Sequence, residues 1–203
     1  MFNMLLKLFF KRILPASLVY YFTFQAYVMY NAFNGEPRLV SIQAIDIMSL
    51  PEKDQATRTE MIHDSVDYYN TKLQWRHFHE EFILEDPLVK VYGIESVVRN
   101  VHFWEVYMGV DEVNTTLKSV THYKSSIKLE LCGRSKTRFG RVDIDITTWL
   151  EVEKYGDSEK IIRMNEEWND IPNISQENTM FPIGWSAEMM RVILGKIIML
   201  FPL

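Results

Sequence analysis

The sequence predicts an α+β fold, because its first half carries helical patterns and its second half carries strands. Met61, Val66 and Tyr69 recur at roughly the spacing of one helical face. In residues 126–131, apolar and polar side chains instead alternate strictly, as they do in a half-buried strand. Helices followed by an antiparallel series of strands predict that the helices pack on one sheet.

Turn and cap residues divide the chain into elements. Pro87 ends the first strand, because proline cannot donate to a strand ladder, and residues 133–140 and 155–158 are interpreted as hairpin loops. The expected elements, in order, are a helix from Asp54 to about Phe78, a strand Glu81–Glu85, a helix of about twelve residues from Gly93, strands 126–131, 141–152 and 160–164, and a last helix capped by Ser186.

The last helix has an apolar stripe made of Met189, Met190, Ile193, Ile197 and Leu200. Such a stripe is typical of a helix that packs on its own domain. A second contact with a membrane surface is the alternative.

Length and charge predict one domain with an appendage. The 203 residues divide into a basic, apolar segment (1–35), a linker (36–53), a folded domain (54–180) and a C-terminal amphipathic helix (181–203). Residues 1–35 carry three basic and no acidic side chains, which leaves a net charge of −8 for the rest of a chain whose total is −5. An acidic body without a basic stripe argues against nucleic acid as a partner. The single cysteine, Cys132, excludes an intrachain disulfide.

The segment from Ile13 to Phe33 contains 21 residues without a charge, preceded by Lys7, Lys11 and Arg12. As a helix it would measure about 32 Å, close to the thickness of a hydrocarbon core. The expected partner of residues 13–33 is therefore a membrane, that of the endoplasmic reticulum or the mitochondrion, reached through a single-pass anchor. The segment is also rich in aromatic and polar residues, and a cleaved signal, a mitochondrial presequence and a docking helix remain open alternatives.

Residues 78–87 read Phe-His-Glu-Glu-Phe-Ile-Leu-Glu-Asp-Pro, and Gly93 follows shortly after. The end of a helix, a short strand stopped by Asp-Pro and a new helix opened by Gly resemble the nuclear transport factor 2-like superfamily, also called SnoaL-like. The resemblance covers roughly residues 55–170. It implies a cystatin-like cone, in which helices pack on a curved antiparallel sheet around a small apolar cavity. Isomerases, dehydratases, cyclases and proteins without any chemistry share this fold, so the fold alone does not assign a function.

The local match extends to ketosteroid isomerase-type members, which place two acids, a short apolar strand and Glu-Asp-Pro in the same order. In those members the Asp before Pro is the general base, and a Tyr from the first helix donates to the developing oxyanion. The resemblance therefore implies Asp86 as the base and Tyr68 as the donor. Their second donor, an acid on a later strand, has no assignable counterpart here. Asp before Pro is also favourable turn chemistry, which leaves a purely structural role for Asp86 open.

A second resemblance lies in residues 163–168, which read Arg-Met-Asn-Glu-Glu-Trp. Many SnoaL-like proteins of unknown role, among them fungal ones, carry a strand that ends Arg-His-Glu-Asp-Glu-Trp or similar. Met164 stands here where His is usual, so chemistry that depends on that His is absent from this chain.

The sequence contains no Gly-rich phosphate loop, no Gly-x-Ser-x-Gly elbow and no Cys or HExxH spacing for a metal, so no cofactor and no metal are expected. We expect a membrane-associated module that binds a small apolar ligand or a protein partner without catalysis, and that dimerises through its sheet. The alternative is a cofactor-free isomerase or lyase that acts on a lipid-like or polyketide-like substrate with Asp86 as its base.

Overall fold

A computed structural model describes residues 11–12, 14–36, 42–70, 72, 74–107, 109–138, 140–175 and 177–201. Its helices are α2 (Leu14–Asn34), the short 3-10 helix η2 (Ile47–Ser49), α3 (Glu52–Tyr69), α4 (Ile94–Val106) and α5 (Ile183–Ile198). Its strands are β1 (Phe78–Glu85), β2 (Lys90–Tyr92), β3 (Asp111–His122), β4 (Ser126–Thr137), β5 (Gly140–Tyr155) and β6 (Ser158–Trp168). Lys7 and residues 37–41 of the expected linker lie outside the described residues.

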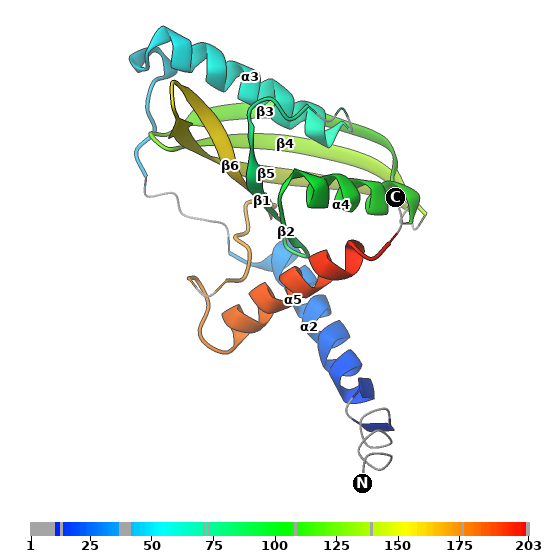
Figure 1. Cartoon of the computed structure of the whole chain (residues 1–203). Helices are drawn as coiled ribbons and strands as arrows, with labels where there is room; N and C mark the ends of the chain where they lie inside the picture. The colour runs from blue at the N-terminus through cyan, green and yellow to red at the C-terminus, as the bar shows by residue number, and fades with distance from the viewer. Residues whose placement is uncertain are drawn as a thin grey trace.

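The strands form one curved sheet in the order β2-β1-β6-β5-β4-β3 (Figure 1). Helices α3 and α4 cover one face of this sheet, which we call the inner face. The α+β prediction is confirmed, but the sheet is mixed rather than purely antiparallel. The first strand, β1, pairs in parallel with the last one, β6. The pattern of a single strand gives no information about the direction of a partner strand far along the chain. The sequence therefore does not predict this parallel pairing.

The core lies between the inner face and the two helices. Ile127, Leu129 and Leu131 of β4 point inward in alternation and are fully buried, as the period of two predicts. They pack with Met61 of α3 and Val97 of α4. The hydrophobic core therefore lies between the sheet and the two helices.

Two strands were not predicted, and one loop was predicted too long. β3 reads DEVNTTLKSVTH, and polar side chains on both of its faces leave no alternating pattern to detect. β2 is only three residues long. The expected loop at residues 133–140 is instead mostly strand, because β4 continues to Thr137. Helix α3 ends at Tyr69 rather than near Phe78.

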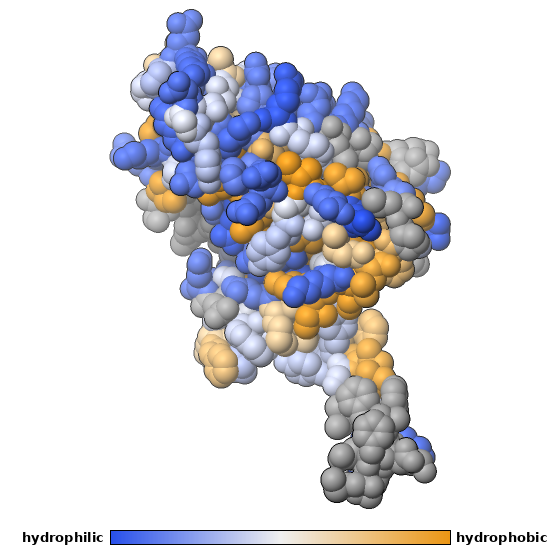
Figure 2. All heavy atoms as spheres, in the orientation of Figure 1, coloured by the Kyte–Doolittle hydropathy of each residue, from blue (hydrophilic) through white to orange (hydrophobic). Residues whose placement is uncertain are grey.

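Helix α5 begins at Ile183, three residues before the expected cap Ser186, which lies inside the helix. It packs on β2 and α4, but largely not through the predicted stripe. Its buried face includes Ala187, Met190, Arg191, Gly195 and Ile198. Apolar side chains of the predicted stripe remain on its exposed side, and Figure 2 shows apolar atoms gathered around this part of the molecule.

Helix α2 docks on the rest of the protein near its C-terminal end. Val28 and Ala32 are buried, and Val28 packs with Ile174 and Ala187. These contacts support the docking-helix alternative for this segment. Among the helices of the described residues, none combines the length and the apolar character needed to cross a membrane.

Candidate functional site

Asp86 lies where β1 ends and its side chain closes the turn that follows. Its Oδ1 accepts the backbone N–H groups of Leu88, at 2.6 Å, and of Val89, at 2.7 Å. This is an Asx-type turn, in which the side chain satisfies donors that no strand partner can reach. The structural role that the Asp-Pro pair allows is therefore present, and it leaves Oδ2 outside these two bonds.

Asp86 also belongs to a polar cluster inside the cone. Glu166 of β6 is buried, and the charge of Asp86 acts on it. The Tyr69 hydroxyl lies 2.6 Å from Thr148 Oγ1, and Glu166 is close enough to raise the pKa of Tyr69. Tyr68 lies beside them and is sensitive to the charges of both acids. Two carboxyl groups and two phenols thus meet at the inner face of β5 and β6.

Burial controls the ionisation of this cluster. It raises the pKa of Asp86 to about 6, against the lowering effect of the Leu88 and Val89 N–H groups. Burial, together with the nearby charge of Asp86, raises the pKa of Glu166 to about 8. Burial and the charge of Glu166 likewise raise the pKa of both tyrosines. Near neutral pH, Glu166 can therefore donate a proton in a hydrogen bond while Asp86 can accept one.

The structure brings Asp86 and Tyr68 into the same cluster, and their catalytic roles stay predictions. Sequence reasoning missed Glu166, although it is an acid on a later strand, the kind of group that could not be placed. The available signal was strand parity, because Met164, Glu166 and Trp168 point to the same side of β6. Tyr69, not Tyr68, makes the hydrogen bond to Thr148.

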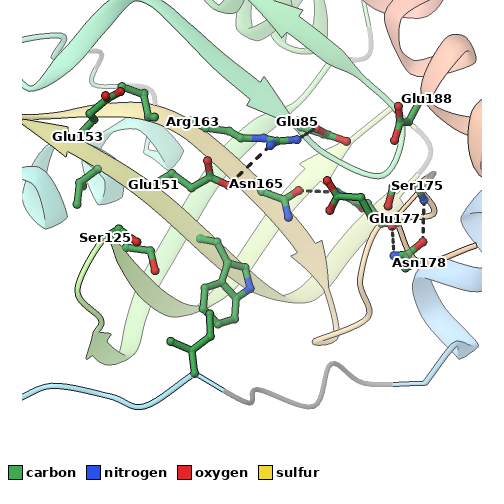
Figure 3. Close-up of a pocket in the computed structure, with 16 residues that line it drawn as sticks. Glu85, Ser125, Glu151, Glu153, Arg163, Asn165, Ser175, Glu177, Asn178 and Glu188 are labelled. Carbon is green, nitrogen blue, oxygen red and sulfur yellow. Dashed lines mark hydrogen bonds and ion pairs between the residues drawn. The ribbon is translucent and has the colours of Figure 1, made fainter.

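A cleft of about 660 Å³ lies on the opposite, outer face of the sheet (Figure 3). Neighbouring residues of a strand point to opposite faces, so Glu85 reaches this cleft while Asp86 faces the interior. Its charged lining residues are Glu85, Glu151, Glu153, Arg163, Glu177 and Glu188, and its apolar ones are Ile42, Trp149, Val152 and Ile162. Neither Asp86 nor Tyr68 lines it. The acidic cleft and the interior cluster are therefore separate sites.

Amide side chains hold the wall of the cleft. Asn173 is buried, and its Nδ2 donates to Asn165 Oδ1 at 2.8 Å and to the Glu166 carbonyl at 2.9 Å. Its Oδ1 has no hydrogen-bond partner among the described residues. A buried acceptor without a donor carries a desolvation cost, and Asn173 is one of the residues that line the cleft.

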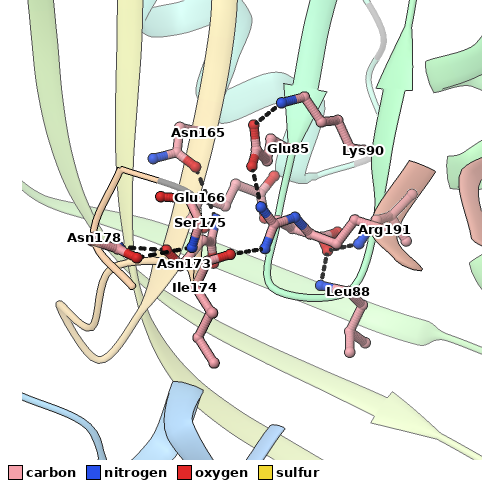
Figure 4. A network of polar contacts seen from close by, with 12 residues as sticks. Glu85, Leu88, Lys90, Asn165, Glu166, Asn173, Ile174, Ser175, Asn178 and Arg191 are labelled. Atoms are coloured by element: carbon pink, nitrogen blue, oxygen red, sulfur yellow. Dashed lines mark hydrogen bonds and ion pairs between the residues drawn. The ribbon is translucent and has the colours of Figure 1, made fainter. Parts of the chain in front are cut away.

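Glu85 joins the cleft to a network of buried charges (Figure 4). Its Oε1 accepts from Arg191 at 2.7 Å, and its Oε2 accepts from Arg163 at 2.8 Å and lies 3.1 Å from Lys90 Nζ. Arg191 also donates to the Ile174 carbonyl at 2.7 Å. Burial alone would raise the pKa of Glu85, but Arg191, Arg163 and Lys90 hold it below its ordinary value. The network connects β1, β2, β6 and α5 through one carboxylate.

In the part of the chain that the structure describes, no group of three or more His, Cys, Asp or Glu is arranged to hold a metal ion. His77, a conceivable ligand by residue type, lies 2.8 Å from Asp64 and 3.1 Å from Glu60. These contacts link the start of β1 to α3.

The arrangement of helices and strands is that of the predicted cone. The chain turns at Asp86-Pro87, and α4 begins after Gly93. Three long antiparallel strands follow, and β6 then pairs with β1. The chain has a nuclear transport factor 2-like, or SnoaL-like, fold.

Similarity to known proteins is found among solved structures. No family model and no curated protein matches the sequence. A putative SnoaL-like polyketide cyclase from Jannaschia is 14% identical, covers 59% of this chain and 90% of its own, and has a TM-score of 0.47. An NTF2-like protein of unknown function from Burkholderia pseudomallei is 8% identical over 56% of this chain and 92% of its own, with a TM-score of 0.48. A hypothetical protein with a ketosteroid isomerase-like fold from Catenulispora acidiphila is 12% identical over 53% and 83%, with a TM-score of 0.44. This is a similarity of fold alone.

Proposed function

We propose that this protein is a non-catalytic, membrane-associated binding module that holds a small ligand in the outer cleft. The observation that supports this most directly is the cleft itself, about 660 Å³ in volume and within the usual range for small-molecule sites. The Glu85 network and the amide of Asn173 hold its walls in place. Asp86 Oδ1 meanwhile accepts two hydrogen bonds from the backbone of its own turn, which supports a structural rather than a catalytic role for this residue.

The lining favours a ligand with a positively charged group on an apolar body. Among the cleft's charged residues, five are glutamates and one is an arginine. The charge of Glu85 is balanced by its own partners, but Glu153 and Glu177 extend the acidic character to the exposed rim. Trp149, Val152 and Ile162 supply apolar wall. This differs from the purely apolar ligand expected inside the cone, which stays a prediction.

Native mass spectrometry of the full chain, followed by organic extraction, tests this proposal. Ser175 lines the cleft, so Ser175→Trp fills it, while Ser119→Trp places the same side chain on β3, away from the cleft lining. The wild-type protein and Ser119→Trp should retain a cationic small molecule that Ser175→Trp loses. An empty wild-type protein, or a ligand that both variants retain, would contradict the proposal.

A second candidate function is a cofactor-free isomerase or lyase on a lipid-like or polyketide-like substrate. The observation that favours it is the interior pair, in which the pKa of Asp86 rises to about 6 and that of Glu166 to about 8. Two carboxyl groups with separated pKa values are suited to act as base and acid. Asp86 would remove a proton, and Glu166 with Tyr69 would stabilise the oxyanion.

Deuterium exchange next to the carbonyl of lipid-like ketones tests this candidate. The exchange, followed by NMR, should stop in Asp86→Asn while the variant keeps its fold by circular dichroism. Equal exchange in the variant and the wild type would exclude Asp86 as the base. The homodimer through the sheet and the endoplasmic reticulum or mitochondrial membrane stay predictions for sedimentation and imaging to test.

A further inference from the structure

Exposed apolar side chains are concentrated in one region of the molecule. Among the described residues, 22 large apolar side chains are exposed; seven of them lie on α2 and eight in residues 180–201. They are Leu18, Val19, Tyr20, Phe22, Tyr27, Tyr30 and Phe33, and Met180, Phe181, Trp185, Met189, Ile193, Ile197, Leu200 and Phe201. We call these residues the α2–α5 face. Scattered apolar residues need no explanation, but a concentration of this size marks an interaction site.

Helix α5 presents a continuous apolar ridge. Trp185, Met189, Ile193 and Ile197 are exposed and follow one another at intervals of four residues, which aligns them along the helix. The helix is fixed from its other side, where Gly195 approaches β2 so closely that a Cβ would lie 2.5 Å from the Lys90 carbonyl. The ridge is therefore held outward by the packing of the opposite side and is not available to the protein's own core.

Helix α2 continues this surface. Its residues 14–34 contain no charged side chain, and up to Tyr27 they are exposed or half-buried. It contacts α5 through Val28 and Ala187, and the Tyr20 hydroxyl lies 3.5 Å from Ser186 Oγ. Figure 1 shows α2 extending away from the sheet beyond its crossing with α5. The two helices thus form one adjoining apolar surface on the side of the protein remote from α3.

The charges beside this face favour an anionic partner. Lys11, Arg12 and Lys196 are exposed beside it, whereas the rest of the protein is acidic. Tyr, Trp and Phe beside basic residues suit the headgroup region of a bilayer. We propose that the α2–α5 face docks on the surface of an anionic lipid bilayer, with the aromatic side chains in the headgroup layer.

The ridge of α5 sets the depth of this contact. Because α5 is bound to the domain along its opposite side, only its exposed side chains can enter the lipid. The acidic cleft includes Glu177 and Glu188, which lie close in sequence to the docking residues. The docking rests on the membrane association in the proposed function, but it does not involve the ligand in the cleft. The vesicle experiment and the ligand experiment can therefore fail separately.

Co-sedimentation of the full chain with phosphatidylcholine vesicles, with and without phosphatidylserine, tests the docking. We expect binding to vesicles that contain phosphatidylserine, weakened by salt because screening reduces the attraction. Phe22→Ser and Ile193→Ser each remove an exposed apolar side chain and should weaken binding on the order of tenfold. Leu117→Ser and Val142→Ser remove exposed apolar side chains of the sheet and should leave binding unchanged.

Three results would overturn the proposal. The first is equal binding to both kinds of vesicle, which would remove the role of anionic lipid. The second is equal loss in all four variants, which would indicate a general effect of hydrophobicity. The third is no vesicle binding together with a dimer that Phe22→Ser and Ile193→Ser dissociate, which would make the face a contact between two copies of the chain.

Discussion

Replacing Arg191 by methionine should destabilise the protein strongly, because the guanidinium is buried and has two partners. Its side chain is 1% exposed and donates to Glu85 Oε1 and to the Ile174 carbonyl, both at 2.7 Å. Methionine keeps most of the aliphatic length but removes every donor. The Ile174 carbonyl and one oxygen of Glu85 are then left without this partner inside the protein.

The size of this loss in stability depends on the partners that Glu85 keeps in the variant. Leaving a buried polar group unsatisfied costs about 1–3 kcal/mol, and removing one partner of a buried ion pair costs about 3–5 kcal/mol. Glu85 keeps Arg163, 2.8 Å away, and Lys90, 3.1 Å away, so the second figure is an upper bound. We expect Arg191→Met to lower the free energy of unfolding by about 3 kcal/mol.

Urea unfolding, followed by circular dichroism, measures this loss. Arg163→Met is the matched control, because Arg163 binds the same carboxylate but its side chain is 34% exposed, and we expect a loss of less than about 1 kcal/mol. The double variant Glu85→Gln, Arg191→Met should lose less than the sum of its single changes. A loss below about 1 kcal/mol for Arg191→Met, or equal losses for both arginine variants, would refute the reasoning.

Three further predictions concern the interior and the packing of α5. Because burial raises the pKa of Glu166 to about 8, the folded protein keeps a proton that the unfolded chain loses near its ordinary pKa. Stability should therefore fall from about pH 5 to about pH 8, on the order of 3 kcal/mol. Since the raised pKa of Asp86 contributes below about pH 6, Glu166→Gln should flatten the dependence between about pH 6 and pH 8; an unchanged slope there in urea titrations would contradict the assignment. Tyr69→Phe removes the hydrogen bond to Thr148 and should cost about 1 kcal/mol, and a double-mutant cycle with Thr148→Val that shows no coupling would argue against that bond. Gly195→Ala should cost about 1–3 kcal/mol, because its Cβ would lie 2.5 Å from the Lys90 carbonyl; an unchanged melting temperature would mean that α5 does not approach β2 this closely.

Several local elements could be predicted because their signals lie within a few residues. Gly93 immediately precedes α4, and Asp86-Pro87 ends β1 as the chemistry of proline requires. The turn at residues 156–157 joins β5 to β6 within the expected loop. In each case the backbone preference of one residue sets a boundary, so no knowledge of the rest of the fold is needed.

The faces of α5 could not be predicted in the same way. Met189, Ile193 and Ile197 are apolar and regularly spaced, which is typical of a core-facing stripe, yet all three are exposed. The helix buries Arg191 and Gly195 instead, because Glu85 supplies a charge partner and β2 requires a residue without a side chain. Both requirements come from segments about a hundred residues earlier in the chain.

By itself the sequence determined the α+β class, the strand that ends at Glu85 before Asp86-Pro87, the helix after Gly93 and the apolar character of α2. Only the tertiary structure decided that β6 returns parallel to β1 and places Glu166 beside Asp86. A periodic pattern reports which side chains share a face, but not which distant segment covers that face. The ionisation of Glu166, the partners of Arg191 and the exposure of the α5 ridge all depend on which distant segments pack around these residues. They are therefore decided only in the folded protein.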